Sequence, residues 1–231
     1  MSDNGSTRRS FVTGLGAGVA ALSVGATAEA QTSGAPAAPA AFRPARHADD
    51  DWLDAIAGQH RMVIDAASPK GAGEAILYAN NLYTSNKSAY GLAESELAIV
   101  IVLRHYATPF AFADATWAKY GRALGTMLEF TDPRSKEAPS VNLYNAAGYG
   151  MQLTNLGTTI DSVLKKGARI AICDQATRFT ASGVARATGT TVDAVYNDFK
   201  ANAVGSSRFV AAGVLAVNRA QEHGYTLIYA G

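Results

Sequence analysis

Short, unbroken apolar runs recur along the chain. They cover residues 61–65, 97–103, 169–173, 208–210 and 225–229. Most are rich in Val and Ile and show no alternation with polar residues, which is typical of parallel strands covered on both faces. The pattern therefore predicts five buried strands.

The segments between the apolar runs show helical periodicity, with apolar residues three and four positions apart. They predict helices over 74–86, 114–128, 151–165, 174–187 and 213–223, and one more opened by Thr190 or Thr191. Strands that alternate with helices favour an α/β protein with a doubly wound, mainly parallel five-stranded sheet and right-handed crossovers.

One stretch departs from this alternation. Residues 131–150 contain two prolines, several charges and the sequence Asn142-Leu-Tyr-Asn145, with no clear period. A loop of this length is usually a functional flap, an oligomerisation arm or a disordered segment.

The first fifty residues have a different composition. Arg8 and Arg9 precede a weakly apolar run rich in Gly and Ala, and Ala28-Glu-Ala30 follows it. This order predicts a twin-arginine (Tat) signal peptide over 1–30, cleaved after Ala30, and hence a periplasmic protein without a membrane segment after cleavage. Residues 31–50, rich in Ala and Pro, are predicted to be a disordered linker. The domain is expected to span 51–231, beginning with a short helix capped by one of Asp49, Asp50 and Asp51.

Composition narrows the classes of partner. The chain has 231 residues, of which 48% are hydrophobic and 17% charged, with a net charge of +1. It can bury a sizeable core, and its charge gives no argument for a nucleic-acid partner. Its single cysteine excludes an internal disulfide bond.

Candidate chemistry gathers at the predicted strand ends, because the carboxyl ends of parallel strands share one edge of a sheet. The short strand 169–173 ends in Cys173, where the next helix begins. The partial positive charge of a helix N-terminus favours a thiolate. Arg104 and His105 follow the preceding strand and would stabilise the same charge. We therefore take Cys173, His105 and Arg104 as candidate catalytic residues, with Asp174 expected to cap the helix rather than face the sulfur.

Each candidate also has a structural interpretation. Cys173 would then be a packed hydrophobe, His105 a hydrogen-bonded structural residue, and Arg104 the partner of an acid such as Asp114. Motifs for nucleotide binding or for a serine nucleophile are absent, and the histidines lack metal-ligand spacing. The sequence thus predicts no cofactor and no metal.

The glycine-led strand from Gly167 to Cys173 and the stretch from Gly213 to Ile228, with its His-Gly-Tyr sequence, resemble the DsrE/DsrF-like family. The resemblance covers roughly residues 59–231 and points to a Tat-exported subgroup. It implies a flavodoxin-like fold, assembly into trimers or hexamers, and a persulfide relay in which Cys173 accepts sulfur. This chain differs from the cytosolic relay members in its predicted export and in an added segment between its second and third strands.

Three functional hypotheses follow. The first is an exported sulfur carrier or sulfurtransferase-like protein with its thiol at Cys173, served by a sulfur donor or another small molecule. The second is a non-catalytic periplasmic module that binds a ligand or partner at the sheet edge. The third, motivated by Tat export, is a metal or redox-cofactor protein that uses His105 and Cys173.

Overall fold

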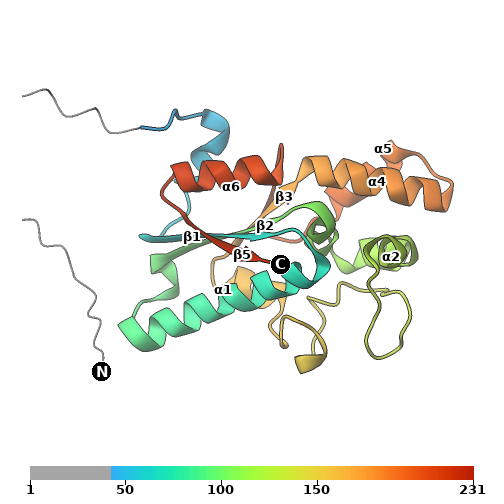
Figure 1. Ribbon diagram of the computed structural model, residues 1–231, viewed down its shortest axis with the longest axis horizontal. Helices are drawn as coiled ribbons and strands as arrows, with labels where there is room; N and C mark the ends of the chain where they lie inside the picture. Colours follow the sequence, from blue (N-terminus) through green and yellow to red (C-terminus); the bar gives the residue numbers. More distant parts are fainter. Residues whose placement is uncertain (1–42) are drawn as a thin grey trace, which may run out of the picture. The chain divides into compact units, whose positions relative to one another are not determined.

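Five parallel strands form the centre of the computed structural model (Figure 1). Their bounds are β1 His60–Ala66, β2 Leu97–Leu103, β3 Arg169–Cys173, β4 Ser207–Val210 and β5 Thr226–Ala230. They lie in the order β4-β3-β2-β1-β5, and every neighbouring pair is parallel. All five predicted strands are confirmed, with ends that shift by no more than one residue.

The structure describes residues 43–231. The predicted signal peptide over 1–30 and most of the predicted linker lie outside the described residues. The linker was predicted to extend to residue 50, but a 3₁₀ helix, η1, already begins at Ala48 and runs Ala48–Leu53. Its N-cap is His47, and none of the three aspartates caps it, because all three lie inside its first turn.

The two faces of the sheet are covered by different helices. The helices of the first three crossovers are α1 Pro69–Tyr90, α2 Asp114–Leu128, α3 Ile160–Lys165, α4 Asp174–Thr188 and α5 Val192–Ala201. Their buried side chains join one large cluster with Ile64, Ile101 and Ile172 of the sheet. The helix α6, Gly213–Glu222, packs on the opposite face with Leu53 of η1. Figure 1 shows α1 and α6 on opposite sides of the sheet.

Strand order explains this division. The chain steps from β1 to β2, β3 and β4 in one direction, and right-handed crossovers then keep the connecting helices on one face. The last crossover runs back from β4 to β5 at the other edge, so the same handedness places α6 on the other face. The protein is therefore an α/β, doubly wound, flavodoxin-like single domain with an entirely parallel sheet.

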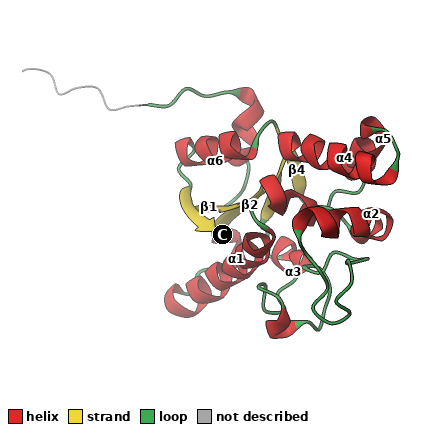
Figure 2. Cartoon of the chain, turned by 45° about the vertical axis from the view of Figure 1, so that its right-hand side comes forward, coloured by secondary structure: helices red, strands yellow, loops and turns green. Residues whose placement is uncertain are grey.

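The chain between α2 and α3 is drawn mainly as loop in Figure 2, yet it is packed into the domain. The buried Asn142 side chain donates to the carbonyl oxygens of Phe110 (2.8 Å) and Phe112 (2.9 Å). The Tyr144 hydroxyl donates to the carbonyl oxygen of Pro69 at 2.7 Å. Disorder, one of the three alternatives for residues 131–150, is therefore wrong. The loop anchors η3, His105–Ala111, which follows β2.

The helix predicted over 151–165 is wrong in its first half. Residues 150–152 form a single 3₁₀ turn, η4 (Gly150–Gln152), and α3 begins only at Ile160. Leu156 and Gly157 adopt left-handed backbone conformations, with φ of 47° and 86°, which interrupt a helix. Thr159 then caps α3 by accepting a hydrogen bond from the amide of Ser162.

Another 3₁₀ turn, η2 (Glu94–Glu96), leads into β2. Among residues 43–231, no helix combines the length and the apolar character that crossing a membrane requires.

Candidate functional site

The carboxyl ends of β2, β3 and β4 open onto one cavity of about 460 Å³. Its lining comes from the turn after β2, the N-terminus of α4 and the N-terminus of α6: Arg104, His105, Cys173, Gln175, Ala176, Phe179, Ala212, Gly213 and Val214. The three candidate residues predicted from the sequence thus meet at one place, although they come from separate parts of the chain.

The position of this cavity follows from the topology. After β3 the chain enters α4 on one face, and after the neighbouring β4 it enters α6 on the other face. Where the connections of adjacent parallel strands part in this way, a crevice forms beyond their carboxyl ends, and open α/β sheets bind ligands there.

Cys173 is both the last residue of β3 and the N-cap of α4. Its Sγ accepts a hydrogen bond from the amide of Ala176 at 3.4 Å. The expectation that Asp174 caps the helix is wrong, because its carboxylate instead accepts from Arg178 and from the hydroxyl of Tyr196. The sulfur is thus the group held at the positive end of α4, where negative charge is stabilised.

Arg104 has a different acidic partner from the one suggested by the sequence. Its guanidinium forms two hydrogen bonds with Asp65 at the end of β1, Nε to Oδ1 at 2.7 Å and Nη2 to Oδ2 at 3.0 Å. Asp114 instead accepts the amide of Asn142. The hydrogen bonds to Asp65 are the main cause of a raised pKa for Arg104. The pair therefore holds the guanidinium charged and in one orientation beside the cavity.

The start of α6 lies directly against Arg104. A Cβ atom added to Gly213 would lie 2.5 Å from the Cβ of Arg104. Only glycine allows this approach without displacing the arginine. The N-cap residue of α6 is Ala212, which makes no side-chain cap. The first amides of α6 therefore lack a side-chain partner at the edge of the cavity.

His105 adopts a left-handed conformation with φ of 52°, which is uncommon for a residue other than glycine. Its ring lies 4.3 Å, centroid to centroid, from that of Tyr106. Among the described residues, it is not hydrogen bonded to Cys173. His105 thus lines the cavity as a nearby imidazole rather than as a hydrogen-bonded base for the thiol.

Two apolar residues of the cavity were not identified from the sequence. Phe179 of α4 is 54% exposed and Val214 of α6 is 62% exposed, an unusual exposure for such side chains. Each lies within the first turns of a helix that follows a strand end, which is the signal that could have identified them. The exposed part of the cavity lining therefore combines these two apolar side chains with two polar ones, His105 and Gln175.

Residues 43–231 contain no cluster of His, Cys, Asp and Glu side chains that could hold a metal ion. The polar groups of the cavity lining are backbone amides, one guanidinium, one imidazole, one thiol and the side-chain amide of Gln175. Such a set suits nucleophilic sulfur chemistry or the binding of a small anionic or polar ligand.

Comparison with known proteins adds little to this picture. No family model and no curated protein matches the chain. Among solved structures, the chain is similar to a protein of unknown function from Methanobacterium thermoautotrophicum, with 13% sequence identity and a TM-score of 0.36. That match covers 74% of this chain and 99% of the other.

Proposed function

We propose that this protein is a sulfur carrier in which Cys173 accepts a sulfur atom as a persulfide. The observation that supports this proposal is the position of the Cys173 sulfur, at the N-cap of α4 and in the wall of a cavity that also contains Arg104 and His105. An amide donor and a nearby guanidinium are the surroundings in which cysteine thiolates are stabilised.

The transfer step is balanced without an added oxidant. The Cys173 thiolate attacks the outer sulfur of a persulfide donor R–S–SH. The S–S bond of the donor breaks, a new S–S bond forms at Cys173, and R–S⁻ leaves while the proton remains on the transferred sulfur. The Ala176 amide and the Arg104 guanidinium stabilise the negative charge on the attacking sulfur.

Mass spectrometry of the intact protein tests the proposal. After incubation with a persulfide donor, wild-type protein should gain the mass of one sulfur atom, and the gain should map to the peptide that contains Cys173. Removal by a thiol reductant should restore the original mass. The Cys173→Ser variant should gain nothing, and an equal gain in that variant would contradict the proposal.

A second candidate is a non-catalytic binding module that uses the same cavity. It is favoured by the low exposure of Cys173, which is 6%. A sulfur that reacts with iodoacetamide only after denaturation would support this second function and exclude the first.

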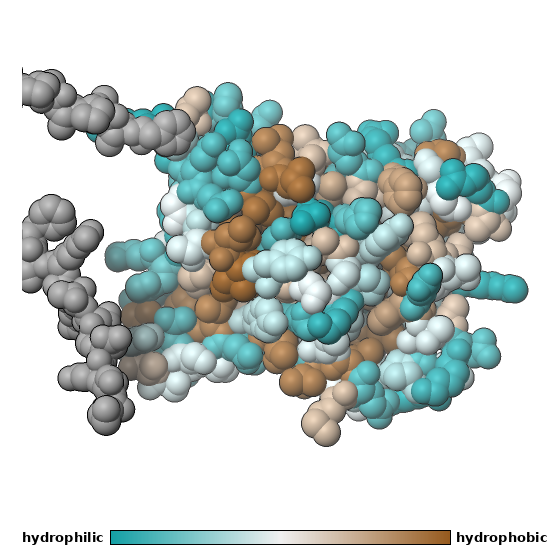
Figure 3. Space-filling view, in the orientation of Figure 1, coloured by the Kyte–Doolittle hydropathy of each residue, from teal (hydrophilic) through white to brown (hydrophobic). Residues whose placement is uncertain are grey.

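We also propose that the protein is a DsrE-like homo-oligomer, most simply a trimer or hexamer. Several large apolar side chains are exposed on α6 and on the edge strand β5, among them Leu215, Leu227 and Tyr229. Figure 3 shows apolar surface in the region where these two elements lie. Multi-angle light scattering should give a mass of three or six chains, and a monomer at micromolar concentration would contradict this.

Export by the Tat pathway is a separate proposal that depends on the sequence of residues 1–30. Replacing Arg8 and Arg9 together by lysine should leave the precursor in the cytoplasm. Undiminished mature protein in the periplasm of cells with this variant would contradict the assignment.

A further inference from the structure

A second hollow, of about 450 Å³, lies between α2 and α4. Phe179 lines both this hollow and the Cys173 cavity, so the two spaces meet at one exposed aromatic side chain. We call the hollow the α2–α4 groove; its lining consists of Lys119, Tyr120, Arg122, Ala123, Thr126, Met127, Phe179, Gly183, Arg186, Ala187 and Thr188. Neither the sequence interpretation nor the proposed function makes use of this groove.

Helical spacing connects the groove to the thiol. Ala176, Phe179, Gly183 and Arg186 follow one another at intervals of three or four residues, so they form one stripe along α4. The stripe starts beside Cys173 and ends at Arg186. Gly183 provides the floor, because a Cβ atom there would lie 3.0 Å from the Met127 sulfur of α2. A side chain at this position would narrow the groove.

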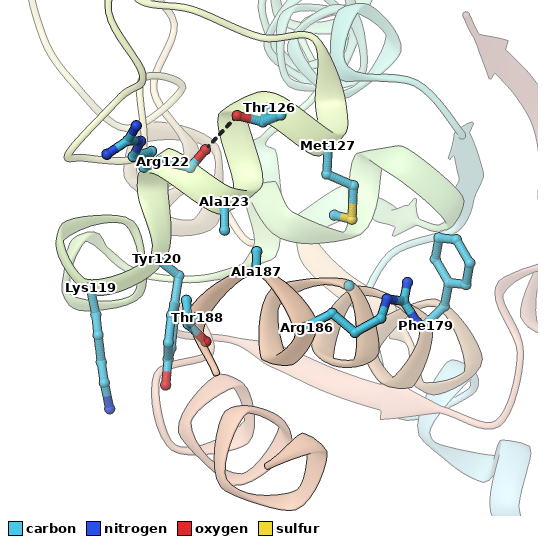
Figure 4. A pocket seen from close by; sticks show the side chains of 11 residues that line it. Lys119, Tyr120, Arg122, Ala123, Thr126, Met127, Phe179, Arg186, Ala187 and Thr188 are labelled. Carbon is cyan, nitrogen blue, oxygen red and sulfur yellow. Dashed lines mark hydrogen bonds between the residues drawn. The ribbon is translucent and has the colours of Figure 1, made fainter. Parts of the chain in front are cut away.

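Figure 4 shows how the walls are arranged. Ala123 and Met127 point from α2 toward α4, and Arg186 extends along α4 toward Phe179. Arg122 points away from α4 in this view. Arg186 is therefore the cationic side chain that faces the path between the groove and the thiol.

The charge of Arg186 lacks a carboxylate partner among residues 43–231, whereas Lys119 at the other end is paired with Asp198. An unpaired guanidinium beside a small apolar groove is complementary to an anionic group, above all a carboxylate or phosphate that it can bind with two hydrogen bonds. The groove is thus complementary to the anionic end of a ligand. The thiol at the other end of the stripe would react with a sulfur atom of the same ligand.

The spacing limits the size of the ligand. Arg186 follows Cys173 by thirteen positions, about 20 Å along the axis of α4. The Arg186 side chain reaches back toward Phe179 and shortens this span. A molecule with its sulfur at Cys173 and its anionic group at Arg186 is therefore elongated, with an apolar or amide-like middle that contacts Phe179.

We infer that the sulfur donor is an elongated, anionic, low-molecular-mass thiol in its persulfide form, with its sulfur at Cys173 and its anionic end at Arg186. This inference rests on the proposed function, since the same Cys173 is the acceptor. The step is the one given above, with R–S⁻ leaving as the free anionic thiol. The groove adds recognition of the group R, which the thiol cavity alone does not provide.

The first experiment compares two donors with the same reactive sulfur and opposite charge: glutathione persulfide, which is anionic, and cysteamine persulfide, which is cationic. The Arg186→Glu variant should receive sulfur from glutathione persulfide about fivefold to tenfold more slowly at low donor concentration. Its transfer from cysteamine persulfide should not slow. The matched control is Lys87→Glu, the same charge reversal at an exposed position in the last turn of α1, and it should leave both rates unchanged.

The second experiment measures binding without sulfur chemistry. In a Cys173→Ser background, calorimetry or NMR titration follows the binding of S-methylglutathione. Adding Arg186→Glu should weaken this binding by about fivefold or more, and added salt should weaken it further in the protein that keeps Arg186. Adding Phe179→Ala should also weaken it, while adding Lys87→Glu should not.

The outcomes separate the two proposals. If S-methylglutathione binds through Arg186 but Cys173 accepts sulfur from neither donor, the carrier function fails and the ligand class stands. If Cys173 accepts sulfur equally well from both donors in every variant, the carrier function stands and the ligand class is overturned. Binding of S-methylglutathione that is undetectable or indifferent to Arg186→Glu also overturns it.

Discussion

The two faces of the sheet are built very differently. One face supports five helices and a cluster that includes Phe110, Trp117 and Tyr144, all fully buried. The other is covered by α6 and η1, and its cluster consists mainly of Val and Ala side chains such as Val100 and Val217. Stability is therefore concentrated on the first face.

The thiol cavity lies where the chain passes from one of these faces to the other. We call the face with five helices the thick layer and the face covered by α6 and η1 the thin layer. The base of the cavity belongs to β3, one wall to α4 of the thick layer, and the other wall to α6 of the thin layer. In such a site the heavily packed wall can keep the nucleophile fixed while the lightly packed wall changes its position. Fold stability and ligand access therefore depend on different faces of the sheet.

The largest effect is expected from the thick layer. Phe110 is fully buried and packs against Trp117, Phe130 and Tyr144. Phe110→Ala should lower the free energy of unfolding by about 3–5 kcal/mol, because it removes an aromatic ring and leaves a cavity. Denaturant unfolding measures this. Val217→Ala, in the thin layer, should lower it by only about 2 kcal/mol. An equal loss of unfolding free energy in the two variants would contradict the difference between the faces.

A smaller loss is expected where α6 meets the site. Gly213→Ala places a Cβ atom against the side chain of Arg104, so either α6 or the arginine must move. The free energy of unfolding should fall by about 1–3 kcal/mol, as for other overpacked positions. The rate of Cys173 alkylation should also change in this variant, because Gly213 and Cys173 line the same cavity. Gly205→Ala, where added volume meets no atom within 4 Å, is the control.

The thiol itself gives the third test. Arg104→Ala removes a cation and leaves the carboxylate of Asp65 unpaired near the cavity. Alkylation of Cys173 by iodoacetamide at pH 7 should slow by about threefold to tenfold. The double variant with Asp65→Asn should recover part of the rate, because the unpaired negative charge is then gone. Unchanged rates in both variants would show that Arg104 does not act on the sulfur.

The smallest effect on stability is expected at Asp54, the residue directly after η1 in the thin layer. Burial alone would raise the pKa of Asp54, but hydrogen bonds from Arg61 and His223 outweigh it and lower the pKa below its ordinary value of 3.8. A carboxyl with a lowered pKa stabilises the folded state above its ordinary value, and this contribution is lost as pH falls through the folded-state pKa.

The stability difference between wild type and Asp54→Asn should therefore shrink as pH falls below about 4. The size should be modest, because Asp54 is half exposed and solvent screens the pair. Thermal unfolding at several pH values measures it. A difference that grows as pH falls below about 4 would contradict the assignment.

Much of the fold could be read from the sequence, because the apolar runs of β2 and β3 have no competing interpretation. The start of α1 was missed. The helix begins at Pro69, and Ser68 caps it by accepting from the amide of Gly71, a signal that two nearby glycines obscured. The helix predicted from residue 151 failed for a different reason, since apolar spacing there continued through a left-handed turn at Leu156 and Gly157.

The candidate site was predictable in part. Strand ends brought Cys173, Arg104 and His105 to one edge, as parallel topology requires. The pairing of Arg104 with Asp65 was not predictable, because it depends on which strands are neighbours, and β1 lies beside β2. The α2–α4 groove was not predictable either, because it depends on the close approach of two helices at Gly183.

The backbone of His105 has a consequence for protein engineering. A residue other than glycine in this left-handed conformation, with φ of 52°, costs about 1 kcal/mol relative to glycine. Glycine adopts this backbone without steric strain, so a design programme that optimises thermal tolerance alone would choose His105→Gly. Such a programme would remove the imidazole from the cavity while reporting an improved protein. Libraries for stabilising this scaffold should therefore hold position 105 fixed until its imidazole has been tested.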